Sequence, residues 1–263
     1  MDLGLKGRAA AVAAAARGLG RATARALAAE GASVALCGRD RARIEEAARA
    51  IADQTGARTL AVAADVGRAD DCRRFVEEAA AAFGRLDVLV TNTGGPRPGT
   101  FAAATDQAWE EAYRVTLANV VHLVRAAVPH MRRNRWGRIV NIASLSAKQP
   151  IDGLILSNAF RPAIVGLAKT LASELGRDGI LVNTVCPGYT RTDRLDEVAR
   201  ARAEKAGTTP AQVLAELAAA APLGRIAEPD ELAAVVAFLC SERASYVTGA
   251  TLQVDGGAYR GLQ

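Results

Sequence analysis

The sequence predicts an α/β protein built on a doubly wound parallel sheet, and two observations lead to that fold class. Short apolar runs alternate with amphipathic stretches along nearly the whole chain. The apolar runs are continuous rather than alternating with polar residues, which is typical of strands that helices cover on both faces. Right-handed crossovers between such strands place helices on both sides of one sheet.

Seven apolar runs have the length and composition of strands. The first has low β propensity because Val12 is its one β-branched residue, so its assignment depends on the glycine-containing turn that follows it. In chain order, the predicted strands cover residues 8–14, 33–38, 59–63, 86–91, 138–143, 180–185 and 250–254.

Helical stretches connect these runs, with apolar residues recurring at the spacing of a helix that buries one face. The predicted helices cover residues 18–30, 40–54, 69–83, 105–133, 155–176 and 228–240. No repeat, linker or low-complexity segment interrupts the pattern, so residues 1–263 are expected to form a single domain.

Residues 191–222 break the alternation. They indicate two helices separated by "GTTP", where Thr208 or Thr209 caps the second helix and Pro210 occupies its first turn. An insertion beside the carboxyl ends of parallel strands is well placed to cover a ligand, so we interpret it as a helical lid. A packed helical hairpin without that role is the alternative.

Composition excludes several classes of protein. Half of the residues are hydrophobic, which excludes a disordered chain, and no apolar run is long enough to span a membrane. We do not interpret the alanine-rich N-terminus as a signal peptide, so a cytoplasmic location is expected. The net charge of +5 comes from scattered arginines without a basic run. This pattern argues against nucleic-acid binding and favours anionic ligands.

Cysteine and histidine usage gives no sign of a metal site. The four cysteines are widely separated, no C-x-x-C pair occurs, and the chain has only two histidines. The cysteines are expected to be buried, reduced side chains.

A glycine pair marks the first strand-to-helix turn. Gly18 and Gly20 allow the backbone to approach a pyrophosphate closely, and the helix that begins there presents free N–H groups to its charge. A G-x-G pair alone is weak evidence for dinucleotide binding. Its position in the first βα unit of an alternating chain makes that evidence stronger.

Six segments together resemble the short-chain dehydrogenase/reductase family, of the kind that includes 3-oxoacyl-carrier-protein reductases. The matching pieces occur in the family's order and span nearly the whole chain. They are "ARGLG" at 16–20, "DV" at 65–66, "LVTNTGG" at 89–95, "GRIVNIAS" at 137–144, "VNTVCPGYTRT" at 182–192 and "YVTGATLQVDGG" at 246–257. The resemblance implies a Rossmann-like fold, a nicotinamide dinucleotide cofactor and a small-molecule substrate.

The resemblance also implies cofactor contacts at the matching positions, from pyrophosphate and adenine to ribose and nicotinamide. These positions are Gly18, Leu19, Gly20, Asp65, Val66, Asn92, Gly94, Pro187, Gly188, Thr190 and Thr192.

The residues after the second strand favour NADP(H) over NAD(H). An NAD enzyme usually places an acid there for the ribose hydroxyls. This chain has Arg39, with Asp40 one position later, and Arg17 lies in the glycine loop. Two guanidinium groups suit a 2′-phosphate through bidentate charge-assisted bonds.

The sequence departs from the family at two places. Ala13 and Ala14 stand where the family has Thr-Gly, and a positive φ at Ala14 would cost about 1 kcal/mol. In the Asn-Ser-Tyr-Lys tetrad, Ser144 matches the serine, but Ser157 and Arg161 replace tyrosine and lysine. Thr116 replaces asparagine, and the chain contains no Y-x-x-x-K at all.

These replacements remove the usual proton donor. A phenol has a pKa near 10, whereas a serine hydroxyl is a far weaker acid, and arginine stays protonated. The candidate catalytic residues are therefore Ser144, Ser157, Arg161 and, for proton supply, Lys148, with Tyr189 as a second candidate acid. Surface exposure of Lys148 without a role is the alternative.

The sequence as a whole predicts an NADP(H)-dependent oxidoreductase for a ketone, 3-oxoacyl or alcohol substrate. The alternative is a protein that binds a cofactor or ligand without turnover, such as a partner subunit of an active relative. Broad apolar faces on helices 105–133 and 155–176 predict a homo-oligomer, a tetramer or a dimer.

Overall fold

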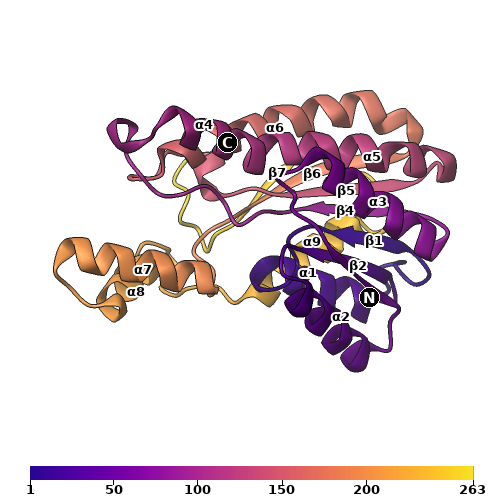
Figure 1. The fold of residues 1–263 in the computed structure, drawn as a ribbon, viewed down its shortest axis with the longest axis horizontal. Coiled ribbons are helices and arrows are strands. Elements are labelled where there is room, and N and C mark those ends of the chain that lie inside the picture. The colour runs from indigo at the N-terminus through magenta and orange to yellow at the C-terminus, as the bar shows by residue number, and fades with distance from the viewer. Residues whose placement is uncertain (263) are drawn as a thin grey trace.

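The computed structural model describes residues 1–262 and contains one seven-stranded sheet. Its strand order is β3-β2-β1-β4-β5-β6-β7, and every neighbouring pair is parallel (Figure 1). The strands are β1 (Ala9–Val12), β2 (Ser33–Gly38), β3 (Thr59–Ala63), β4 (Val88–Thr91), β5 (Gly137–Ile142), β6 (Ile180–Pro187) and β7 (Thr251–Val254). The predicted doubly wound α/β fold is confirmed.

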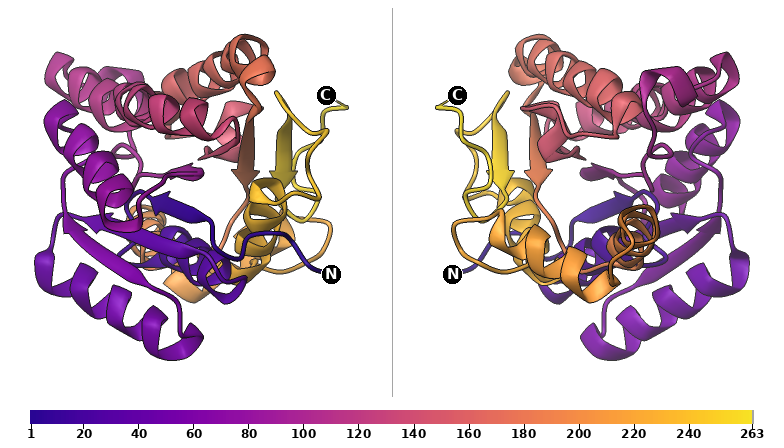
Figure 2. Two further views of the ribbon diagram at one scale, coloured as in Figure 1. Left: turned by 90° about the vertical axis from the view of Figure 1, so that its right-hand side faces the viewer. Right: turned by 90° about the vertical axis from the view of Figure 1, so that its left-hand side faces the viewer.

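Helices cover both faces of the sheet, as Figure 2 shows from two sides. On one face α3 (Ala69–Phe83), α5 (Asn119–Asn134) and α6 (Ile155–Leu175) form a buried core with the sheet. On the other face α1 (Gly18–Ala29), α2 (Arg41–Thr55) and α9 (Pro229–Cys240) form a second core. Both cores are mainly aliphatic, in keeping with the aromatic content of 4%.

The helix predicted over 105–133 is interrupted. It consists of α4 (Asp106–Tyr113), a π-helical turn (Arg114–Ala118) and α5. A π turn inserts one residue into the helical ladder and is often found at functional sites. It carries the buried Thr116, three residues before α5 begins. Apolar periodicity did not reveal this turn, because its flanks keep the ordinary helical spacing.

The insertion forms α7 (Asp193–Ala206) and α8 (Pro210–Ala219), which project from one side of the molecule in Figure 1. As predicted, Pro210 occupies the first turn of α8, and Thr209 forms a capping box with Gln212. The two helices share a small apolar core of their own, formed by Leu195, Ala199, Ala203, Val213, Leu217 and Ile226.

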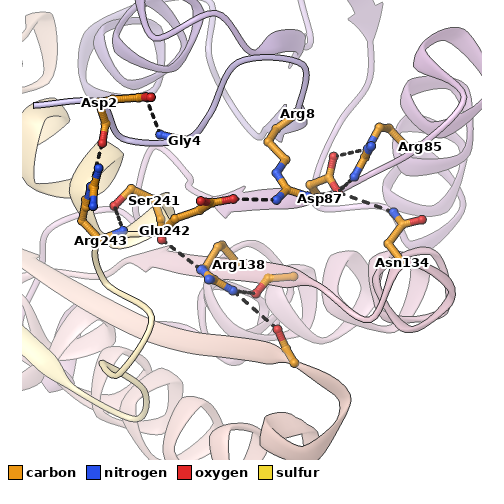
Figure 3. A network of polar contacts seen from close by, with 12 residues as sticks. Asp2, Gly4, Arg8, Arg85, Asp87, Asn134, Arg138, Ser241, Glu242 and Arg243 are labelled. Atoms are coloured by element: carbon orange, nitrogen blue, oxygen red, sulfur yellow. Dashed lines mark hydrogen bonds and ion pairs between the residues drawn. The ribbon is translucent and has the colours of Figure 1, made fainter.

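A polar network fixes the amino ends of the strands (Figure 3). The fully buried Asp87 accepts hydrogen bonds from Arg85 and from the main-chain N–H of Ala9. Arg138 is buried and donates to the carbonyls of Ser241 and Gly137, and burial lowers its pKa to about 10. This network lies at the opposite edge of the sheet from the loops described next, so it supports the fold.

The four cysteines are buried and unpaired. Burial raises the pKa of the Cys37, Cys72 and Cys240 thiols to about 12, which makes them inert at neutral pH. Within residues 1–262, no three histidine, cysteine or carboxylate side chains come together as a metal site, and no helix is both long and apolar enough to cross a membrane.

Candidate active site

The strand order reverses between β1 and β4, and the loops that follow β1, β4, β5 and β6 meet at that edge. In doubly wound sheets, ligands bind in this crevice beyond the carboxyl ends of the strands. Most of the predicted cofactor and catalytic residues lie on or beside these loops, whereas Arg39 follows β2, Asp65 and Val66 follow β3, and Ser157 and Arg161 lie in α6.

The loop after β1 is tightly packed around Ala14. Ala14 has a φ of 48°, so the strained conformation that the sequence predicted is present. Its carbonyl accepts a hydrogen bond from Asn92 Nδ2 across 3.2 Å. A Cβ at Gly20 would lie 2.5 Å from the same carbonyl oxygen, so only glycine fits at that position. The loop, β4 and the start of α1 are thereby held together.

The first turn of α1 fits a pyrophosphate. Its N-cap, Arg17, makes no side-chain capping bond, and the turn contains no acidic residue. The first amides of the helix, from Gly18 to Gly20, are therefore available to an anionic group, which the helix dipole also favours. The residues present fit the phosphates of a dinucleotide.

The end of β2 lacks a free acid. The carboxylate of Asp40 caps α2 by accepting from the Arg43 amide across 3.1 Å, and it also pairs with the Arg43 side chain at 3.3 Å. Arg39 is exposed, and its guanidinium has no partner within residues 1–262. Arg17, by contrast, forms an ion pair with Asp193 of α7 across 2.8 Å. Arg39 is thus the available cation at this position.

The remaining predicted cofactor positions line the crevice or support it. Asp65 accepts from the Gly67 amide across 2.9 Å, and Val66 packs against the core. A side chain at Gly94 would meet open space, whereas one at Gly188 would lie 2.8 Å from Asp255. Gly188 follows Pro187 at the end of β6, Thr190 is buried, and Thr192 caps α7 through the Leu195 amide.

The three serines near β5 are arranged differently from the expected tetrad. Ser144 follows β5 and accepts a hydrogen bond from the Ser146 amide across 3.1 Å. The buried Ser157 pairs with Ser146 rather than Ser144, with 2.9 Å between the hydroxyl oxygens. Ser146, which sequence reasoning left without a role, therefore links the two candidate hydroxyl donors.

Arg161 is buried and holds the end of β5. Its Nη1 donates to the carbonyls of Ile142 and Ala143 across 2.9 and 2.7 Å, while its buried Nε has no partner within residues 1–262. Burial lowers the Arg161 pKa to about 10, so the side chain stays protonated at neutral pH. Nη2 faces the loop after β4, 3.4 Å from the position of a Cβ on Gly95. Within residues 1–262 no carboxylate lies within 4.0 Å of this guanidinium, so the site contains a fixed positive charge without an ion-pair partner.

Cys186, at the end of β6, lies close enough to Ser144, Lys148 and Arg161 for all three to affect its thiol. Burial raises the pKa of its thiol, and a hydrogen bond from the Ser144 backbone and the charges of Lys148 and Arg161 oppose that rise. Lys148 lies in the loop after β5, with Nζ 5.8 Å from the centre of the Tyr259 ring. Tyr259, in the C-terminal tail, was not identified from the sequence because nothing local places it there.

A cavity of about 310 Å³ borders Leu145, the residue that follows Ser144 in the chain. Four segments line it: the loop between β5 and α6, the residue two positions after β6, the α7–α8 insertion and the C-terminal tail. The lining residues are Leu145, Gln149, Pro150, Ile151, Asp152, Tyr189, Arg202, Ala220 and Ala258. Tyr189, the second candidate acid, is among them.

Comparison with known proteins assigns the chain to a family. Residues 13–259 match the family model described as Enoyl-(Acyl carrier protein) reductase. The protein is a short-chain dehydrogenase/reductase. The resemblance predicted from six sequence segments is thereby confirmed.

Relatives of this short-chain dehydrogenase/reductase match over nearly their whole length. Short-chain reductase protein NovJ of Streptomyces niveus is 37% identical over 242 residues, covering 92% of this chain and 90% of its own. The 3-oxoacyl-acyl-carrier-protein reductase FabG of Escherichia coli is 35% identical over 257 residues, covering 98% and 99%. L-sorbose reductase from Gluconobacter frateurii, solved with NADPH and L-sorbose, is 36% identical, with a TM-score of 0.95 and complete coverage of both chains.

Proposed function

We propose that the protein is an NADP(H)-dependent oxidoreductase that reduces a ketone or 3-oxoacyl group, or oxidises the corresponding alcohol. The observation that carries the proposal is that an uncapped α1 N-terminus at the switch point between β1 and β4 and Ser144, which follows the next strand β5, lie at the same edge of the sheet. The reductases among its relatives, including one solved with NADPH, support the same conclusion.

NADPH would supply a hydride to the carbonyl carbon, leaving a negative charge on the carbonyl oxygen. In this proposal Ser144 and Ser157, whose hydroxyl contacts Ser146, donate hydrogen bonds to that oxygen, and the Arg161 charge stabilises it through the low-dielectric interior. Positioning and charge stabilisation supply much of a catalysed rate even without a strong acid. Lys148 is the best local group to deliver the final proton, directly or through water.

The cofactor choice is tested by titrating NADPH and NADH into the protein by calorimetry. We expect NADPH to bind more tightly, and Arg39→Ala to weaken NADPH about tenfold or more while leaving NADH unchanged, because a charge-assisted phosphate contact is lost. Arg49→Ala, which changes an arginine on α2 away from the crevice, is the control. Equal affinity for the two cofactors would contradict the assignment.

The catalytic assignment is tested with a panel of ketones and 3-oxoacyl thioesters. Ser144→Ala should abolish the reduction, and Lys148→Ala should lower it by about 10²-fold and alter its pH profile, as expected for loss of acid–base help. Lys169→Ala, an exposed lysine on α6, should behave as wild type. Ser157→Tyr combined with Arg161→Lys should raise the activity on simple ketones, because it restores a phenol beside a lysine.

Ala14, Ser157 and Arg161 favour the second function, a protein that binds cofactor or ligand without turnover. That function holds if no carbonyl compound or alcohol turns over while NADPH still binds, and if Ser144→Ala leaves ligand binding unchanged.

A further inference from the structure

The cavity next to Leu145 has walls of mixed polarity. Its apolar lining residues are Leu145, Pro150, Ile151 and two alanines, and its charged residues are Asp152 and Arg202. At about 30 Å³ of liquid volume for each water, the volume of about 310 Å³ suits a ligand with about ten non-hydrogen atoms. The cavity thus has room for a small substrate, and Leu145 in its wall is the neighbour of Ser144 in the chain.

Arg202 lies on the inward side of α7. Leu195, Ala199 and Ala203 are the buried residues of that helix, four positions apart, and Arg202 lies seven positions after Leu195 on the same face. Arg202 is partly buried over the cavity, whereas Arg200 and Glu204, two positions to either side, are exposed. From the sequence, Arg202 was one of many scattered charged residues, and nothing distinguished it from the others.

No carboxylate lies within 4.0 Å of the Arg202 guanidinium within residues 1–262, and the side chain has no hydrogen-bond partner there. The other partly buried arginine of α7, Arg194, contacts Glu197 and the carbonyl of Pro96. Partial burial of a guanidinium is costly without an anion to pair with it. Asp152, in the same cavity, is exposed and forms no such pair.

We propose that Arg202 binds a carboxylate carried by the substrate, so that the preferred substrates are keto acids. This proposal rests on the proposed reductase function. A carboxylate suits one guanidinium, which can hold both of its oxygens, whereas a phosphate dianion usually requires more than one cation. The reacting carbonyl would lie at Ser144 and the carboxylate at Arg202, with Gln149 and Tyr189 also lining the cavity.

The test compares straight-chain six-carbon acids carrying an oxo group at position 2, 3, 4 or 5 with their methyl esters, which lack the charge. For wild type we expect kcat/KM at least tenfold higher for the best acid than for its ester. Arg202→Gln should bring that ratio close to one, and Arg202→Lys should keep part of it. Arg200→Gln, on the exposed side of α7, should keep the wild-type ratio.

A change at Asp152 should shift the ratio of acid to ester in the opposite direction to Arg202→Gln. The Asp152 carboxylate repels a substrate anion, so Asp152→Asn should raise the ratio of acid to ester. The melting temperature of each variant and its NADPH affinity show whether the variant has folded.

Calorimetry of the same acids on the NADP⁺-loaded protein separates this proposal from the reductase function. If an acid binds to wild type and at least tenfold more weakly to Arg202→Gln, the carboxylate site stands even without turnover. Equal use of acid and ester by wild type would overturn it. An unchanged ratio of acid to ester in Arg202→Gln would also overturn it. The proposal is equally overturned if none of the acids binds.

Discussion

Arg17 Nη1 lies 2.8 Å from Asp193 Oδ2, so an ion pair joins the glycine loop after β1 to the first turn of α7. On the other side of the crevice, Arg194 Nη2 of the same helix donates to the Pro96 carbonyl across 3.2 Å. The first turn of α7 therefore bridges the loops that follow β1 and β4. This bridge supports a lid role for the insertion. Because α7 also packs against α8, the insertion is a packed helical hairpin as well.

The ion pair predicts the effect of freeing Arg17. Asp193→Asn should raise NADPH affinity by about two- to fivefold, because an exposed pair is worth up to about 1 kcal/mol and its loss leaves Arg17 with only the longer, 4.0 Å pair to Glu197. Titrations at low and high salt measure this, and the gain should vanish at high salt. Asp196→Asn, on the same helix without a partner, is the control. Unchanged or weaker NADPH binding at low salt would contradict the prediction.

The φ of 48° at Ala14 predicts that glycine at this position would make the folded protein more stable. Ala14→Gly should stabilise the fold by about 1 kcal/mol, because glycine adopts this conformation without the steric cost of a Cβ. Urea unfolding measures the change. Ala13→Gly, one position earlier and without a positive φ, should instead destabilise by about 0.5–1 kcal/mol. Similar effects at the two positions would show that strain at Ala14 is not the cause.

The lowered pKa of the buried Arg161 predicts that the stability of the protein changes at high pH. Burial lowers the Arg161 pKa from 12.5 to about 10, so between these pH values the unfolded chain binds more protons than the folded protein. The free energy of unfolding of wild type, relative to Arg161→Met, should therefore be level below pH 9 and rise as the pH passes 10. Urea unfolding of both proteins from pH 8 to 11 measures this difference.

Comparison with Arg161→Met isolates this arginine, because Arg138 also has a pKa near 10 and its titration cancels between the two proteins. A difference that stays level, or falls, between pH 9 and 11 would show that the buried cation is not destabilised as described.

An aromatic cluster on α4, α6 and the short turn at Phe101–Ala103 before α4 supports the predicted homo-oligomer. The Trp109 ring contacts those of Phe101 and Phe160, with centroids 6.5 and 5.9 Å apart, and Phe101 and Tyr113 are 74% and 50% exposed. We expect a tetramer or a dimer by light scattering at micromolar concentration. Tyr113→Glu should lower the mass, and Gln107→Glu, which adds the same charge on α4, should not. A monomeric wild type would end this prediction.

Most of the fold was predictable from the sequence because its signals are local. Continuous apolar runs located the strands to within about two residues, and helical spacing located α1, α2, α3, α6 and α9 equally well. The strain at Ala14 was also predictable, because a glycine-type turn imposes its φ on whatever residue occupies it. The π turn at 114–118 was not, since it leaves no local pattern.

The candidate site was predictable as a set of residues but not as a set of contacts. The sequence predicted that Ser157 and Arg161 stand at the tyrosine and lysine positions, from their distance along the chain to Ser144. Only the tertiary structure showed that Ser157 pairs with Ser146 and that Arg161 turns to the carbonyls at the end of β5. Which of several near neighbours a side chain contacts depends on how α6 packs against β5.

The longest-range features were decided by tertiary structure alone. Arg17 and Asp193 are 176 positions apart, and the cavity below Arg202 is assembled from four separate segments. Helical spacing fixes which side of α7 Arg202 shares with Leu195, but not what that side faces. What it faces is set by the packing of the insertion against the carboxyl ends of the strands, because burial and charge pairing depend on distances in space rather than along the chain.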